Sequence, residues 1–183
     1  VGYAPAATLT EDAGANPVKA EWAINGTTDV IVCDAIGANK AIKKTASPHL
    51  TPQFHHLLSW IEFQVLADGQ EAIDTWGGVQ SITIVNTANK VEYSLAPFAA
   101  TTPTATFSGT QNLATKTYPA DGTPALQALT TTSALYSYAL TEPNKAYYEV
   151  TVGPTKGPET AATKQLQYNA VPATHHSITI AAN

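Results

Sequence analysis

The chain has 183 residues, a formal net charge of -5 and only 13% charged residues. All nine cationic side chains are lysine, and no arginine occurs. This balance excludes a basic surface for nucleic acids and the bidentate guanidinium contacts typical of phosphate recognition. The abundance of threonine and alanine, with 12 prolines and 11 glycines, is typical of a secreted or surface β protein.

The first 17 residues predict an extended N-terminal arm with few apolar anchors. Because Val1 is not methionine, we expect the chain to begin at a processing site or at a chosen boundary within a longer chain. No apolar run approaches the roughly 20 residues that a membrane-spanning helix needs. Cys33 is the single cysteine, so it has no partner for an internal disulfide, and its apolar neighbours predict burial.

Two short strands follow the arm. Residues 19–24 and the apolar run 30–33 are separated by Asn25-Gly26, a strong turn signal. The next segment, 38–52, contains several lysines and prolines and predicts a solvated connection.

The longest apolar run, residues 54–66, predicts one continuous strand. From position 57 onward alternate residues form a nearly apolar face that includes Ile61, Phe63 and Val65. The opposite face is mixed, which indicates a strand with one side in a sandwich core. Residues 68–78, with two glycine-containing turns, predict a loop.

Two hairpins are predicted after this strand. The first joins alternating strands at 81–86 and 91–95, and the second joins 133–140 to 146–152 through Glu142-Pro143-Asn144-Lys145. Residues 96–132 predict a long loop with short strands at 104–107 and 116–118. Two last strands are expected at 164–168 and 177–181, and no helix longer than a couple of turns is indicated.

These elements predict an all-β fold of one or two small antiparallel β-sandwiches with transthyretin-like or immunoglobulin-like Greek-key topology. Residues 1–17 form the arm and 18–132 the first sandwich. Residues 133–183 either complete that sandwich or form a reduced second domain with a terminal strand suited to donation.

Candidate chemistry is sparse. Two histidine pairs, His55-His56 and His175-His176, could meet if their strands paired, but adjacent strand residues point to opposite faces, so a metal site is not expected. The carboxylates close in sequence are Glu62, Asp68, Glu71 and Asp74, which solvated loop charge explains. No nucleophile, zinc-protease or phosphate-loop motif is present, so we expect no enzyme activity and no cofactor.

Aromatic residues support an alternative function as a monomeric surface module that binds carbohydrate or host molecules. A stacking platform would need several of them exposed on one face, although most aromatics of a sandwich lie in its core. The candidates are Trp60, Trp76, Tyr136, Tyr138, Tyr147 and Tyr148.

Four parts of the chain resemble the Bacteroidales fimbrillin family, the type V pilins and their relatives, and two of them, 54–65 and 81–95, match well. The pattern Phe54-x-His56-x-Leu58-Ser59-x-Ile61-x-Phe63-x-Val65 is similar to the family strand F-x-H-x-L-[SA]-x-[VI]-x-F-x-V. The later run at 81–95 is similar to the family's "SITI-x-N … Y-S-L", and Trp22 with Asp29-Val30 looks like an earlier pair of family strands. The closing pattern at 174–180 matches less well, because Thr174 stands where the family has glycine.

The resemblance implies a non-catalytic subunit of a surface fimbria, exported across the outer membrane as a lipoprotein precursor, trimmed at its N-terminus and polymerised by donor-strand exchange. Its partners would be copies of itself or related pilin subunits, with host or bacterial surface molecules as adhesive targets. The chain is shorter than a two-domain pilin, which leaves stalk, tip and anchor positions open.

Edge chemistry leads to the same hypothesis, because a sandwich with an open edge accepts a strand from another chain. The candidate donor strand is the uncharged, alternating segment Ser177, Ile178, Thr179, Ile180 and Ala181. The N-terminal arm could be a displaced piece or a staple across the next subunit. The alternative is that both ends pair within their own subunit.

Overall fold

The computed structural model describes most of the chain as β-structure in four sheets. The described residues are 2–11, 17–33, 53–95, 105–117, 127–145, 147–156, 162–167 and 176–180. Within these ranges every strand pairing is antiparallel except that of β16 with β6. The predicted all-β sandwich class is confirmed.

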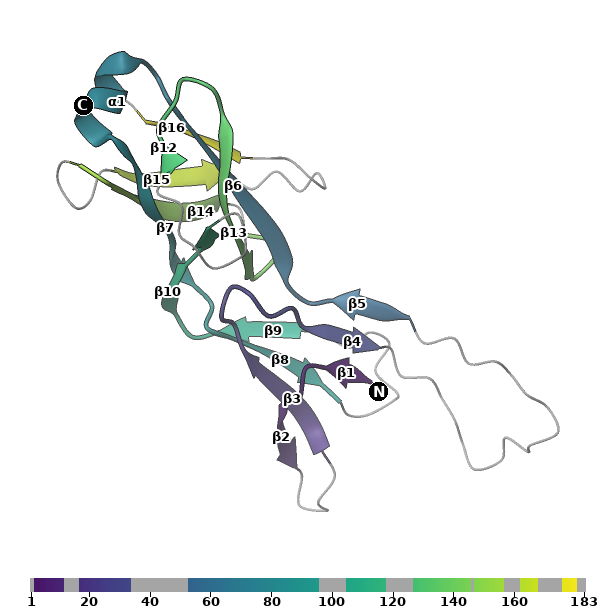
Figure 1. Cartoon of the computed structure of the whole chain (residues 1–183). Helices are drawn as coiled ribbons and strands as arrows, with labels where there is room; N and C mark the ends of the chain where they lie inside the picture. Colours follow the sequence, from purple (N-terminus) through teal and green to yellow (C-terminus); the bar gives the residue numbers. More distant parts are fainter. Residues whose placement is uncertain are drawn as a thin grey trace, which may run out of the picture.

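The sheets form two sandwiches that lie end to end in Figure 1. In the one drawn below, here called the lower sandwich, three strands pair in the order β1-β4-β5: β1 (Tyr3–Ala4), β4 (Ile31–Cys33) and β5 (Phe54–His56). The facing sheet has the order β2-β3-β8-β9: β2 (Thr8–Glu11), β3 (Pro17–Ala23), β8 (Lys90–Ser94) and β9 (Ala105–Ser108). Tyr3 and Trp22 join the two sheets by an edge-to-face contact with ring centroids 5.5 Å apart.

The other pair of sheets forms the upper sandwich. One sheet has the order β11-β13-β6-β16: β11 (Lys116–Thr117), β13 (Ala134–Thr141), β6 (Ser59–Ala67) and β16 (His176–Ile180). The other has the order β10-β7-β14-β15: β10 (Gln111–Ala114), β7 (Gly78–Thr87), β14 (Tyr147–Pro154) and β15 (Ala162–Gln167), with β12 (Gln127–Ala128) also paired to β7.

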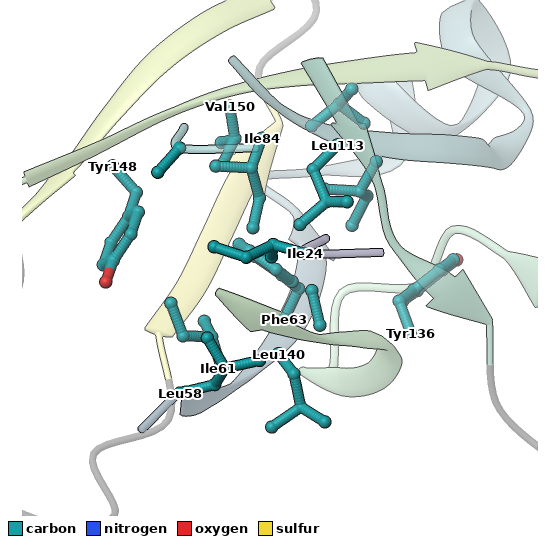
Figure 2. Close-up of a cluster of buried hydrophobic side chains, with 14 of the residues drawn as sticks. Ile24, Leu58, Ile61, Phe63, Ile84, Leu113, Tyr136, Leu140, Tyr148 and Val150 are labelled. Carbon is teal, nitrogen blue, oxygen red and sulfur yellow. The ribbon is translucent and has the colours of Figure 1, made fainter. Parts of the chain in front are cut away.

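The core of the upper sandwich follows the predicted alternation. Ile61, Phe63 and Val65 of β6 are buried, and they alternate with more exposed residues. From the facing sheet, β7 and β14 contribute Ile84 and Val150, each fully buried. Figure 2 shows Ile61 and Phe63 on one side of Ile24 and Ile84 and Val150 on the other. Ile24 directly follows β3 of the lower sandwich and belongs to the same buried cluster as these residues.

The segment between β6 and β7 is not the predicted loop. It contains the two-turn helix α1 (Gln70–Trp76), which buries Ala72 and Trp76 against the core. Gly77 ends the helix with a positive φ of 73°, a conformation that glycine adopts without steric cost. Two buried side chains spaced four residues apart are the helical signal that the flanking glycines obscured.

The predicted continuous strand at residues 54–66 is also corrected. The chain bends at Leu57–Leu58, where the Leu57 backbone N–H donates to the Val30 carbonyl at 2.8 Å. β5 pairs with β4 in the lower sandwich, and after a gap of two residues β6 begins in the upper one. Phe54 and His56 are therefore exposed, while Leu58, Ile61, Phe63 and Val65 are buried.

Neither predicted hairpin forms. β7 continues through Ala88–Asn89 into β8, but the first pairs with β10, β12 and β14, and the second with β3 and β9. Likewise β13 and β14 lie in the two facing sheets of the upper sandwich. The alternation of apolar residues determines which face of a strand is buried, but it does not determine which strand pairs with it. The two predicted hairpin pairings were wrong for this reason.

The sheets combine strands from the three segments into which the sequence was divided, residues 1–17, 18–132 and 133–183. Both sheets of the upper sandwich combine strands from before and after residue 132, and strands from the first 17 residues pair in both lower sheets. In the described part of the chain, the backbone passes between the sandwiches at Leu57–Leu58, Ala88–Asn89 and Gly109–Thr110. The loop 38–52 lies outside the described residues.

None of the helices in the described ranges is long and apolar enough to cross a membrane.

Candidate functional site

The predicted donor segment forms β16, the edge strand of the sheet β11-β13-β6-β16. It runs parallel to β6, with Ile178 in register with Val65 and Ile180 in register with Ala67. Both partners on β6 are buried. Ser177, Ile178, Thr179 and Ile180 lie in this strand, and Ala181 lies outside the described residues.

β6 depends on β16 for one of its two ladders. Its other side pairs with β13 over most of its length. Without β16 the backbone N–H and C=O groups facing that side would have no strand partner, which is the open edge that strand addition requires. The structure thus pairs the candidate donor strand with β6, which contains the second half of the stretch 54–65, within one subunit.

A polar network lies at the point where β7 leaves the upper sandwich. The Glu142 carboxylate accepts hydrogen bonds from the Ala88 backbone N–H at 2.9 Å and from the Thr87 hydroxyl at 3.2 Å. Thr87 and Thr141 are fully buried, and their hydroxyls lie 2.6 Å apart. The Tyr148 hydroxyl donates to the Glu142 carbonyl. These bonds satisfy polar groups that would otherwise be buried without partners.

Beside this network lies a surface concavity with a volume of about 320 Å³. Its lining comes from β7, from the connection after β13 and from β14: Val85, Asn86, Lys145, Tyr147 and Glu149. Val85 and Glu149 are directly paired across the strands. The Lys145 ammonium donates to the Asn86 carbonyl at 2.8 Å and lies 2.7 Å from the Glu142 carboxylate, which fixes this wall.

Sequence reasoning named only Tyr147 among the residues of the concavity. A usable signal was present, because alternation that buries Tyr148 and Val150 places Tyr147 and Glu149 together on the opposite face. No such signal exists for Asn86, which reaches the site through the pairing of β7 with β14.

The predicted aromatic platform does not assemble as one face. Trp76, Tyr136 and Tyr148 are buried, and burial raises the pKa of the Tyr136 hydroxyl. On the outer side of the upper sandwich Trp60 stacks on Tyr138, with ring centroids 4.5 Å apart and an interplanar angle of 7°. Tyr147 lies in the other sheet of that sandwich.

The other candidate groups remain apart. His55 and His56 are exposed, and His56 Nδ1 contacts the Asp29 carboxylate. Glu62 accepts from the Trp60 indole at 3.1 Å, and Asp74 accepts from Gln70 at 2.9 Å. Within the ranges that the structure describes, no three His, Cys, Asp or Glu side chains gather to hold a metal ion. His175 lies outside those ranges.

A ladder of charges crosses the outer face of the lower sandwich. Glu92 on β8 lies between Lys90 at 3.2 Å and Lys19 at 3.3 Å, and Lys90 also reaches Glu21 at 3.0 Å. Hydrogen bonds from Lys90 and Lys19 lower the pKa of Glu92. Hydrogen bonds to Glu21 and Glu92 raise the pKa of Lys90. The ladder links the paired strands β3 and β8 on the outer face of their sheet.

Comparisons with known proteins bear on the fold. No model of a protein family matches the sequence, and no curated protein does. Among solved structures, the chain is similar to a protein of Bacteroides uniformis ATCC 8492 described as a "putative cell adhesion protein". The two are 15% identical with a TM-score of 0.54, over 94% of this chain and 63% of that protein. At this identity the likeness shows a shared fold, and the present chain spans 63% of that protein's length.

Proposed function

We propose that this chain is a non-catalytic structural subunit of a bacterial surface fimbria that supports adhesion and assembles by strand exchange. Its partners are copies of itself or related subunits. The observation that carries the proposal is β16, a parallel strand at the end of its sheet whose removal opens one backbone ladder along β6.

Two further observations support a role at the cell surface. The fold is shared with a protein whose description names cell adhesion, and that protein comes from Bacteroides. The strand motif from Phe54 to Val65 and the run 81–95 resemble those of Bacteroidales fimbrillins. The shared fold and the two sequence stretches are separate observations, and each is a similarity to proteins of Bacteroides or its relatives.

The first test compares the full chain with a version lacking residues 177–183 by size exclusion with light scattering, and by gel electrophoresis after boiling. Strand exchange predicts heat-resistant ladders of the full chain and none of the truncated one, because each inserted strand adds a complete ladder and an apolar row to its neighbour. Well-folded monomers of both forms would contradict the proposal and favour the monomeric binding module.

A locked variant keeps the test valid if the truncated chain fails to fold. Gln64 and Ser177 are register partners, so cysteines at both positions, with Cys33→Ser, would hold β16 in its own subunit when oxidised. Assembly should stop under oxidation and resume after reduction. Assembly at the same rate in both states would show that another segment is exchanged.

A further inference from the structure

The concavity beside Lys145 has the properties of a built site. It opens on the outer face of β7 and β14, since the alternate residues Tyr148 and Val150 fill the core. Its rim is fixed on both sides: Lys145 is held by Glu142 and by the Asn86 carbonyl, and the Asn86 backbone N–H donates to Asn112 at 3.3 Å. Asn86 has a positive φ of 53°, which turns the chain away at the rim.

The lining offers an aromatic ring and an acceptor beside each other. Tyr147 is 49% exposed although it is a large aromatic residue on a strand. Glu149 follows on the same face, and its carboxylate has no ion pair with any residue whose side chain the structure describes. An aromatic face binds the apolar face of a sugar ring, and a carboxylate accepts hydrogen bonds from two neighbouring hydroxyl groups.

Charge and size narrow the ligand class. The Lys145 cation is already paired with Glu142, so the three side chains Glu142, Lys145 and Glu149 together carry one net negative charge. An anionic sugar would be repelled, whereas a neutral one would not. A volume of about 320 Å³ lies at the lower end of the roughly 300–1,000 Å³ range of ligand pockets, which suits one sugar ring better than a long chain.

The second exposed aromatic surface fits a sugar less well. One face of Trp60 is covered by Tyr138, and its indole N–H is bound to Glu62. Trp60 is 52% exposed, about as much as Tyr147, so it serves as a matched control.

We propose that the concavity lined by Tyr147, Glu149, Asn86 and Lys145 binds a neutral pyranose, such as the terminal sugar of a surface glycan. The ring stacks on Tyr147, and two of its hydroxyl groups donate to Glu149. This inference rests on the proposed surface role and supplies the chemistry of the adhesive contact.

The experiment measures binding of the methyl glycosides of glucose, galactose, mannose and N-acetylglucosamine to the full chain by saturation-transfer NMR and titration. The methyl glycoside of N-acetylneuraminic acid is the anionic comparison. At least one neutral sugar should bind, and the anionic sugar should bind at least tenfold more weakly. Binding should fall at least tenfold in Tyr147→Ala and in Glu149→Gln, and stay within twofold in Trp60→Ala.

Three results would overturn the assignment: no binding of any neutral sugar, preference for the anionic one, or loss on Trp60→Ala with retention on Tyr147→Ala. Thermal unfolding of each variant shows that it is folded. The same variants are tested for assembly, which separates the two proposals. Normal assembly without sugar binding refutes only the pyranose site, and sugar binding by a chain that never assembles refutes only strand exchange.

Discussion

The two sandwiches are stabilised in different ways. The upper sandwich is built on long strands, with nine residues in β6 and ten in β7, and its core residues Phe63, Ile84 and Val150 are fully buried. In the lower sandwich one whole sheet consists of strands of two or three residues, and all of β5 is exposed. The lower sandwich is held together by the contact of Trp22 with Tyr3 between its two sheets and by the charge ladder between β3 and β8. We therefore expect the upper sandwich to be the more resistant to opening.

The largest expected effect comes from the upper core. Phe63→Ala should lower the free energy of unfolding in urea by about 3–5 kcal/mol, because it removes a fully buried ring and leaves a cavity. The matched change in the lower sandwich is Phe54→Ala, which removes a ring that is 53% exposed and should cost less than about 1 kcal/mol. Equal losses in the two variants would contradict the contrast between the sandwiches.

The junction between the sandwiches gives the next effect. Glu142→Ala leaves the Thr87 hydroxyl and the Ala88 N–H without their acceptor, at a cost of about 1–3 kcal/mol. Hydrogen exchange at Ala88 should accelerate more than exchange at Ile84 in the centre of the upper core. Glu149→Ala removes a carboxylate that has no ion pair with any side chain that the structure describes; it is the control and should change stability little. Equal exchange at both sites would show that Glu142 does not hold the connection at Ala88.

The charge ladder gives the smallest effect. In the folded chain the pKa of Glu92 lies below its usual value of 4.5, so its stabilising contribution is present above that pH and is lost as the pH falls through the lowered pKa. Glu92→Gln should therefore have a slightly lower thermal midpoint than the native chain at pH 7, and the difference should shrink at strongly acidic pH and in high salt. A difference of the same size at all these conditions would refute an electrostatic origin.

The sequence predicted the buried faces of the strands well and the strands that they pair with poorly. Ile61, Phe63 and Val65 were placed on one buried face from alternation alone, because each pleat exposes or buries its own side chains. The partners of β7 and β8 depended on contacts with segments far along the chain, which alternation does not encode. The bend at Leu57–Leu58 was hidden for the same reason: the apolar run continues across it while its two halves serve different cores.

The candidate sites divide in the same way. The edge strand was predicted from its own residues, since a short uncharged alternating segment carries its signal locally. The concavity needed Val85 and Asn86 to meet Tyr147 and Glu149, and only the register of β7 against β14 brings them together.

The three described crossings of the backbone between the sandwiches have a mechanical consequence. Two domains joined by a single linker transmit a pulling force through one peptide segment, and that segment extends before either domain bears the force. Here a force applied to the opposite ends of the molecule is shared by Leu57–Leu58, Ala88–Asn89 and Gly109–Thr110, and each is anchored in a strand at both ends. We therefore expect a pulling force to load both sandwiches together, and no single cut within the described ranges separates them.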